Sequence, residues 1–168
     1  MIIGITGGTG CGKTTLLNLS AEQGGMVLDC DAIYHDLLQK DTGLLQAIED
    51  RFPGVVKNGV LDRKALGAIV FSNEAALRDL NRITHAAVKE AVLEKLSSQP
   101  SLAAIDAIGL FEGGLAELCH VTVAVTAPED VRIARLMTRD GITEEYAKMR
   151  ISAQHEDAWF RENATTPW

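Results

Sequence analysis

A glycine-rich segment near the start of the chain has the residue types and spacing of a phosphate-binding loop. Residues 7–14 read G-G-T-G-C-G-K-T, which fits G-x-x-x-x-G-K-[ST] in full. Glycines here let successive backbone N–H groups turn toward phosphate oxygens, the lysine reaches the β- and γ-phosphates, and the final hydroxyl binds Mg²⁺. A helix beginning at Thr14 would direct its positive dipole end at the same anion. The segment therefore predicts a site for a nucleoside triphosphate.

The candidate nucleotide contacts in this loop present N–H groups, an ammonium group or a hydroxyl group. They are Gly8, Gly10, Cys11, Gly12, Lys13, Thr14 and Thr15. Lys13 is also a catalytic candidate, because a lysine at this place stabilises charge on a transferred phosphoryl group. The apolar run before the loop and the helical pattern after it disfavour an accidental match.

Two carboxylates follow the second apolar run as a D-x-D motif, Asp29 and Asp31. Transfer of a phosphoryl group to an alcohol needs a carboxylate that orients the hydroxyl and accepts its proton. We expect Asp31 to be this base and Asp29 to hold Mg²⁺ through water. Strand alternation would send the two side chains in different directions. Two alternatives stay open: Asp31 caps the next helix, or the two roles are exchanged.

Three arginines, Arg132, Arg135 and Arg139, share one face of a helix that a capping box at residues 126–129 is expected to open. Arginine suits bidentate phosphate contacts, although an ordinary solvated stripe is the alternative. Arg139 precedes an Asp-Gly turn signal, where we expect a lid over residues 139–150 to begin.

Two further residues, Arg150 and Gln154, share a face of the following helix and are candidates for nucleotide binding. Surface pairing is the alternative for Gln154. His85 lies within a long helical pattern, where a structural histidine is as reasonable as a functional one.

Four apolar runs, at residues 2–6, 26–30, 102–108 and 121–125, alternate with helical patterns. This order predicts an α/β fold, a doubly wound parallel sheet of the P-loop NTPase type, with ligands at the carboxyl ends of the strands. Residues 32–98 contain no convincing core strand and predict a helical insertion that binds the acceptor. Within it, Asp62 and Asn73 each begin a pattern typical of a helix start with a capping side chain. We expect residues 1–168 to form a single kinase domain.

The composition limits the class of protein. The net charge is −7 and 46% of the residues are hydrophobic. An acidic chain without clustered basic residues disfavours nucleic acid as a partner, and no apolar run is long enough for a membrane span. The three cysteines form no C-x-x-C pair, which fits a reducing compartment. We therefore expect a cytoplasmic protein that acts on small molecules.

Several motifs in order along the chain resemble the signatures of the dephospho-coenzyme A kinase family. They are the loop at residues 4–14, D-x-D at 29–31, G-V-L-D-R at 59–63, I-T-H at 83–85, L-F-E at 110–112, R-L-x-x-R at 135–139 and R-I-x-x-Q at 150–154. The resemblance implies phosphorylation of the 3′-hydroxyl of dephospho-coenzyme A with ATP and Mg²⁺.

Carried onto this sequence, the resemblance implies a role for each matching residue. Asp31 would be the base, Lys13 the phosphate contact, Thr14 the magnesium contact, and Arg139 the lid cation. The acceptor side would include Arg63, His85 and Glu112.

Two other functions remain open from the residues alone. Another small-molecule P-loop kinase, acting on a nucleoside, nucleotide or sugar, would share the loop, the acidic base and the lid arginine. A nucleotide-dependent switch is disfavoured, because the sequence has neither N-K-x-D nor L-S-G-G-Q.

The end of the sequence departs from the family pattern. After residues 161–163 the family continues through an Ala-Asp pair into a last strand and helix, whereas this sequence ends at Trp168. We expect an incomplete adenine wall and a loosely held segment from about residue 140 onward.

Overall fold

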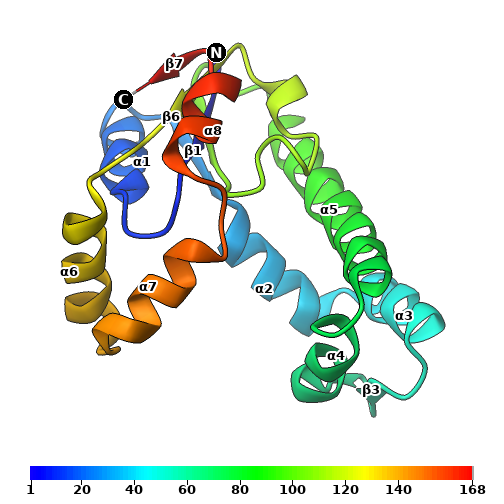
Figure 1. The fold of residues 1–168 in the computed structure, drawn as a ribbon. Coiled ribbons are helices and arrows are strands. Elements are labelled where there is room, and N and C mark those ends of the chain that lie inside the picture. The colour runs from blue at the N-terminus through cyan, green and yellow to red at the C-terminus, as the bar shows by residue number, and fades with distance from the viewer. Residues whose placement is uncertain (168) are drawn as a thin grey trace. The chain divides into compact units, whose positions relative to one another are not determined.

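The structure is a computed structural model that describes residues 1–167. The chain forms two compact units (Figure 1). The first contains Met1–Asp29 and the chain from Gln99 onward, and the second contains Cys30–Ser98.

The first unit is built on a parallel sheet of five strands, in the order β2-β5-β1-β6-β7. The strands are β1 (Ile2–Thr6), β2 (Met26–Asp29), β5 (Ala103–Asp106), β6 (Val121–Ala124) and β7 (Thr166–Pro167). Ile5 of β1 is in register with Asp106 of β5 and with Val123 of β6. The carboxyl ends of these three strands therefore meet at one edge, and the predicted doubly wound sheet is confirmed.

The predicted strands are correct in place, but three of them are too long. Observed β2 ends one residue before the predicted end, β6 also ends one residue early, and β5 ends two residues early. Their ladders stop where the chain turns away into loops or, after β2, into a helix. Hydrophobicity continues past these points because the first loop residues, such as Ala107 and Val125, are still buried.

The strand β7 corrects our expectation that no strand follows the helix predicted to carry Arg150 and Gln154; that helix, α7, itself ends at Ser152 and does not include Gln154. Thr166 and Pro167 pair in parallel with Val123 and Ala124 of β6. The hydroxyl of Thr122 accepts a hydrogen bond from the backbone N–H of Thr165 at 2.9 Å, which fastens the start of β7. The sheet therefore has a fifth strand within the described residues.

Four α-helices accompany this sheet, α1 (Lys13–Glu22), α6 (Glu129–Asp140), α7 (Glu144–Ser152) and α8 (Asp157–Asn163), together with the short 3₁₀ helix η1 (Ala116–Leu118). Helix α1 packs on β1, β2 and β5. The predicted capping box of α6 is wrong: Pro128 is the N-cap residue, and the hydroxyl of Thr126 accepts a hydrogen bond from Arg161 instead.

The second unit is mainly helical. Its elements are α2 (Cys30–Lys40), α3 (Thr42–Arg51), β3 (Val56–Lys57), β4 (Val60–Leu61), α4 (Arg63–Val70) and α5 (Glu74–Leu96). Helices α2, α3 and α4 each pack against the long α5, and their apolar faces form one core. Asp62 and Asn73 cap α4 and α5 through their side chains, as the sequence predicts. The short antiparallel hairpin β3-β4 was not predicted.

In the part of the chain that the structure describes, every helix is too short or too polar to span a bilayer.

Phe160 is the main apolar anchor of α8, with no exposed surface. We expect Phe160→Ala to lower the free energy of unfolding by about 3–5 kcal/mol, because it removes a fully buried ring and leaves a cavity. Phe71→Ala is the matched control, since Phe71 is 92% exposed. Urea denaturation of both variants is the measurement. Equal midpoints for the two variants would contradict this description of α8.

Candidate active site

The phosphate-binding loop connects β1 to α1 and depends on glycine for its shape. Gly7, Gly10 and Gly12 have φ angles of +137°, +77° and +100°, which other residues rarely adopt. A Cβ atom at Gly7 would lie 2.1 Å from the carbonyl oxygen of Val125. Helix α1 begins at Lys13, one residue earlier than predicted, and its N-cap Gly12 has no side chain that could cap it. The N-terminus of α1 is thus open to an anion.

Two arginines of α6 hold the carbonyl groups on the outside of this loop. Arg132 donates from Nε to the carbonyl oxygen of Thr9 at 2.9 Å. Arg135 donates from Nη1 to the carbonyl oxygens of Gly10 and Cys11, each at 3.1 Å. In a peptide group the C=O and the next N–H point in opposite directions. The N–H groups of residues 10, 11 and 12 therefore turn away from α6, as phosphate binding requires.

Arg132 is the most enclosed charge in this arrangement, with 4% of its surface exposed. Besides the bond to Thr9, its Nη1 pairs with Asp157 of α8 at 3.1 Å. A Cβ atom at Gly8 would lie 2.1 Å from Arg132 Nη2, so a larger residue there would displace this guanidinium group. That Nη2 is buried and has no hydrogen-bond partner among the described residues. Leaving it unpaired costs free energy, which the hydrogen bonds of the other nitrogens of Arg132 offset.

Two of the three arginines on this face, Arg132 and Arg135, therefore have a role that neither prediction anticipated. For Arg132 both the solvated stripe and the direct phosphate contact are wrong, because its bonds go to the loop backbone and to Asp157. Arg135 also bonds the loop backbone. Gln154 completes the support: its Oε1 accepts a hydrogen bond from the N–H of Thr9 at 2.8 Å.

The side chain of Lys13 reaches back to the phosphate-binding loop. Its Nζ donates to the carbonyl oxygens of Gly7 and Gly8 at 2.9 and 3.2 Å. Burial lowers the pKa of Lys13, and the charge of Asp106 acts in the opposite direction. The two hydrogen bonds hold the ammonium group of Lys13 at the loop.

Asp106 is a residue that the sequence analysis missed. It ends β5, the strand between β1 and β2, so its backbone lies one strand nearer to the loop than that of Asp29, its register partner. The available signal was a carboxylate at the carboxyl end of a core strand, the place where ligands of such sheets gather.

The side chains near the loop include oxygen ligands of the kind that Mg²⁺ prefers. Thr14 is exposed in the first turn of α1, and Asp29 and Asp106 end neighbouring strands. Among residues 1–167, no group of three or more histidine, cysteine or acidic side chains is arranged to hold a metal ion. Magnesium is usually bound by one or two protein groups together with substrate phosphates and water, so a larger cluster is not required.

Cys11 contributes to the loop only through its backbone. Its side chain is buried in a cluster with Ile5, Leu17, Ala104 and Val125, and burial raises the pKa of its thiol. Its predicted nucleotide contact is therefore confined to the N–H group.

Two arginines from the segment predicted to form a lid meet at one carboxylate. Arg139, near the end of α6, and Arg150, on α7, both donate to Asp140, a contact that the sequence analysis did not predict.

Glu112 lies beyond β5, where its carboxylate pairs with His155 Nε2 at 2.9 Å. The ring of His155 stacks on Trp159, with centroids 3.8 Å apart. Glu112 is thus brought beside the segment that contains Gln154. Its expected contact with the acceptor stays a prediction.

The second unit carries the remaining acceptor candidates. Asp31 is the second residue of α2, not the residue before it, so the capping alternative is wrong. The strand ends at Asp29, and strand alternation therefore does not orient Asp31. His35 is four residues further along α2. Its Nε2 atom lies 3.7 Å from Oδ1 of Asp31, and its Nδ1 atom lies 3.5 Å from Nη2 of Arg63. His35 was missed, although its spacing from Asp31 was a readable signal. His85 is half-buried on α5.

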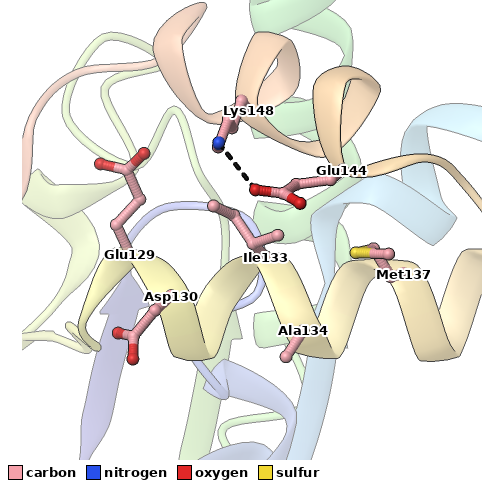
Figure 2. A pocket seen from close by; sticks show the side chains of 7 residues that line it. All are labelled: Glu129, Asp130, Ile133, Ala134, Met137, Glu144 and Lys148. Atoms are coloured by element: carbon pink, nitrogen blue, oxygen red, sulfur yellow. Dashed lines mark ion pairs between the residues drawn. The ribbon is translucent and has the colours of Figure 1, made fainter.

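A cavity of about 450 Å³ lies between α6 and α7 but belongs to a different face of α6 (Figure 2). Ile133 points from α6 toward the ion pair of Lys148 with Glu144 on α7. None of the loop residues lines this cavity, and the arginines that hold the loop lie on the other side of the helix.

Comparison with known proteins gives one family. The family model described as dephospho-CoA kinase matches residues 1–166. A dephospho-CoA kinase of Anaeromyxobacter dehalogenans is 42% identical over 159 residues, 91% of this chain and 75% of that protein.

Two solved structures resemble the whole chain. TT1252 from Thermus thermophilus has a TM-score of 0.83 at 34% identity and covers 99% of this chain, with 86% of its own chain matched. Dephospho-CoA kinase from Campylobacter jejuni has a TM-score of 0.65 at 25% identity, with the same coverage of 99% and 86%.

Arg132 gives a direct test of how the loop is held. We expect Arg132→Gln to weaken ATP and ADP binding by about tenfold, because the loop N–H groups lose their preset direction. Arg161→Gln is the control, since Arg161 bonds the hydroxyl of Thr126 and not the loop. Calorimetric titration of both variants is the measurement.

The same substitution also leaves Asp157 without its cation and lowers stability, so a second variant is needed. Asp157→Asn keeps the bond from Arg132 to Thr9 and should reduce the melting temperature without a comparable loss of nucleotide affinity. Wild-type affinity in Arg132→Gln would show that the loop does not depend on this arginine.

Proposed function

Because this chain belongs to the dephospho-CoA kinase family, we propose that its residues carry out transfer of the γ-phosphoryl group of ATP to the 3′-hydroxyl of dephospho-coenzyme A. The products are ADP and coenzyme A, and the reaction is the last step of coenzyme A biosynthesis. The observation that carries the site assignment is the binding of three loop carbonyl groups, those of Thr9, Gly10 and Cys11, by Arg132 and Arg135. That arrangement turns the N–H groups of the next three residues away from α6.

On the nucleotide side, the N–H groups of Gly10, Cys11 and Gly12 and the open end of α1 bind the phosphates. Lys13 exchanges its bonds to the Gly7 and Gly8 carbonyls for bonds to phosphate oxygens. Because the ammonium is already in place, little reorganisation is needed when charge develops on the transferring group. Arg139 and Arg150 add charge from the lid.

On the acceptor side, Asp31 orients the hydroxyl and accepts its proton. It lies in the first turn of α2, near the positive end of the helix dipole. Arg63, with His35 beside it, offers a cation for the phosphates of the acceptor. His85 and Glu112 are assigned to acceptor binding by family resemblance.

For the metal, Thr14 would bind Mg²⁺ directly, with Asp29 and Asp106 acting through water. When bound, the cation neutralises charge between the β- and γ-phosphates.

An acceptor panel tests the function. Purified protein with Mg-ATP is offered dephospho-coenzyme A, AMP, a nucleoside, pantothenate and shikimate in turn, and ADP release is measured. We expect ADP to form in proportion to dephospho-coenzyme A only. Lys13→Ala should lower this rate at least about 100-fold while keeping the fold, as judged by circular dichroism. Faster turnover with another acceptor would overturn the substrate, and full activity of Lys13→Ala would overturn the loop assignment.

Asp31→Asn separates the two carboxylates of the D-x-D motif. We expect kcat to fall by about 10²–10⁴-fold with little change in ATP affinity, because the amide keeps the shape but cannot accept the proton. Asp29→Asn should instead raise the Mg²⁺ concentration needed for half-maximal activity. If Asp29→Asn lost kcat while Asp31→Asn remained active, the two roles would have to be exchanged.

A further inference from the structure

One carboxylate joins the two arginines expected to bind phosphate in the lid. Asp140 accepts hydrogen bonds from Nε and Nη2 of Arg139 at 2.7 and 2.9 Å. It also accepts one from Nη1 of Arg150 at 2.6 Å. Arg139 is on α6 and Arg150 is on α7, so a single side chain fixes the junction of two helices.

The junction itself is short. Helix α6 ends at Asp140, Gly141 follows with a φ of +64°, and Thr143 caps α7 through its hydroxyl. Without an anion between them, two guanidinium groups brought this close would repel each other. Asp140 removes that repulsion, and its two partners hold the pKa of its carboxyl well below the usual range, so the carboxylate is ionised at neutral pH.

The contribution of these ion pairs to the stability of the fold does not explain the arrangement. The side chains of Arg139, Arg150 and Asp140 are 59%, 35% and 25% exposed. Ion pairs with this much contact with water contribute little to the free energy of unfolding. Their geometry, by contrast, is well defined, because a bidentate arginine and carboxylate fix each other's plane.

The arginines keep donors for a second anion. A guanidinium group has five N–H donors, and Asp140 uses the Nε–Nη2 edge of Arg139 and one terminal nitrogen of Arg150. Nη1 of Arg139 and Nη2 of Arg150 are not engaged by Asp140. The carboxylate and a phosphate can therefore bind the same guanidinium groups together.

We propose that Asp140 is a positioning residue that holds Arg139 and Arg150 as one cationic fork for the phosphates of bound ATP. It touches neither substrate and acts only through the two arginines. The proposal rests on the proposed function, in which those arginines bind phosphate during transfer.

The chain offers a matched control on the same helix. Asp130 is an exposed acid in the first turn of α6, on the face that lines the outer cavity (Figure 2). Asp130→Asn removes the same charge as Asp140→Asn, so any general effect of net charge appears in both variants.

The first experiment measures kcat, the KM for ATP and the Kd for ATP in the two variants. We expect Asp140→Asn to lower kcat by about tenfold and to change the Kd for ATP less than about threefold, because positive charge is kept and only its placement is lost. Asp130→Asn should match the wild type. A tighter Kd with unchanged kcat would show that Asp140 competes with phosphate and would overturn the proposal. A lower melting temperature with unchanged kcat would reduce Asp140 to a structural role.

A double-mutant comparison tests whether Asp140 acts through its partners. In an Arg139→Gln, Arg150→Gln background, Asp140→Asn should reduce kcat further by less than about twofold. A full tenfold loss in that background would exclude action through the arginines.

A second measurement does not depend on the acceptor. Hydrogen exchange of residues 141–150 is followed with and without a non-hydrolysable ATP analogue. We expect the analogue to protect this segment in the wild type and Asp130→Asn, and much less in Asp140→Asn. Failure of the acceptor panel with intact protection would overturn only the substrate, whereas equal protection in all three proteins would overturn the role of Asp140.

Discussion

The structure depends on turning the N–H groups of one short loop to the same side. A backbone segment that does so must place its carbonyl groups on the other side, where each needs a hydrogen-bond donor. Arg132 and Arg135 of α6 supply those donors to Thr9, Gly10 and Cys11. An arginine is suited to this work because its planar group presents several N–H donors in fixed directions. The electrostatics of the loop are therefore set by residues more than 120 positions away in the sequence.

This constraint links the end of the chain to its beginning. Arg132 is held by Asp157 at the start of α8, and Gln154 just before α8 bonds the N–H of Thr9. Phe160 anchors α8 in the interior, and β7 extends the sheet next to β6. Residues 154 and 157 thus support the phosphate loop, whereas the expectation of an incomplete adenine wall stays a prediction. The expected lid movement of the segment from about residue 140 stays a prediction.

Whether the sequence predicted a feature depends on how far apart in the chain the interacting residues are. Strand positions, the loop and the caps at Asp62 and Asn73 are local patterns, and they were predicted. The capping box at residues 126–129 failed because a distant residue, Arg161, took the hydroxyl of Thr126. The same limit explains the arginine face: spacing placed Arg132 and Arg135 on one side of a helix, but it cannot tell which backbone that side meets. Residues that act through register, such as Asp106, need the strand order as well.

The arginines of α6 and α7 show one residue type in two physical roles. Arg132 is buried, and its hydrogen bonds go to other groups of the protein, which it holds in place. Asp157 balances its charge. Arg139 and Arg150 are more exposed and share one carboxylate, which leaves donors for a ligand. Burying a charge is tolerable only where its partners are permanent, whereas a group that must exchange partners during a reaction has to remain near water. On α6, the buried Arg132 therefore has a fixed structural role, whereas the exposed Arg139 retains the access to water that its proposed contact with the nucleotide requires.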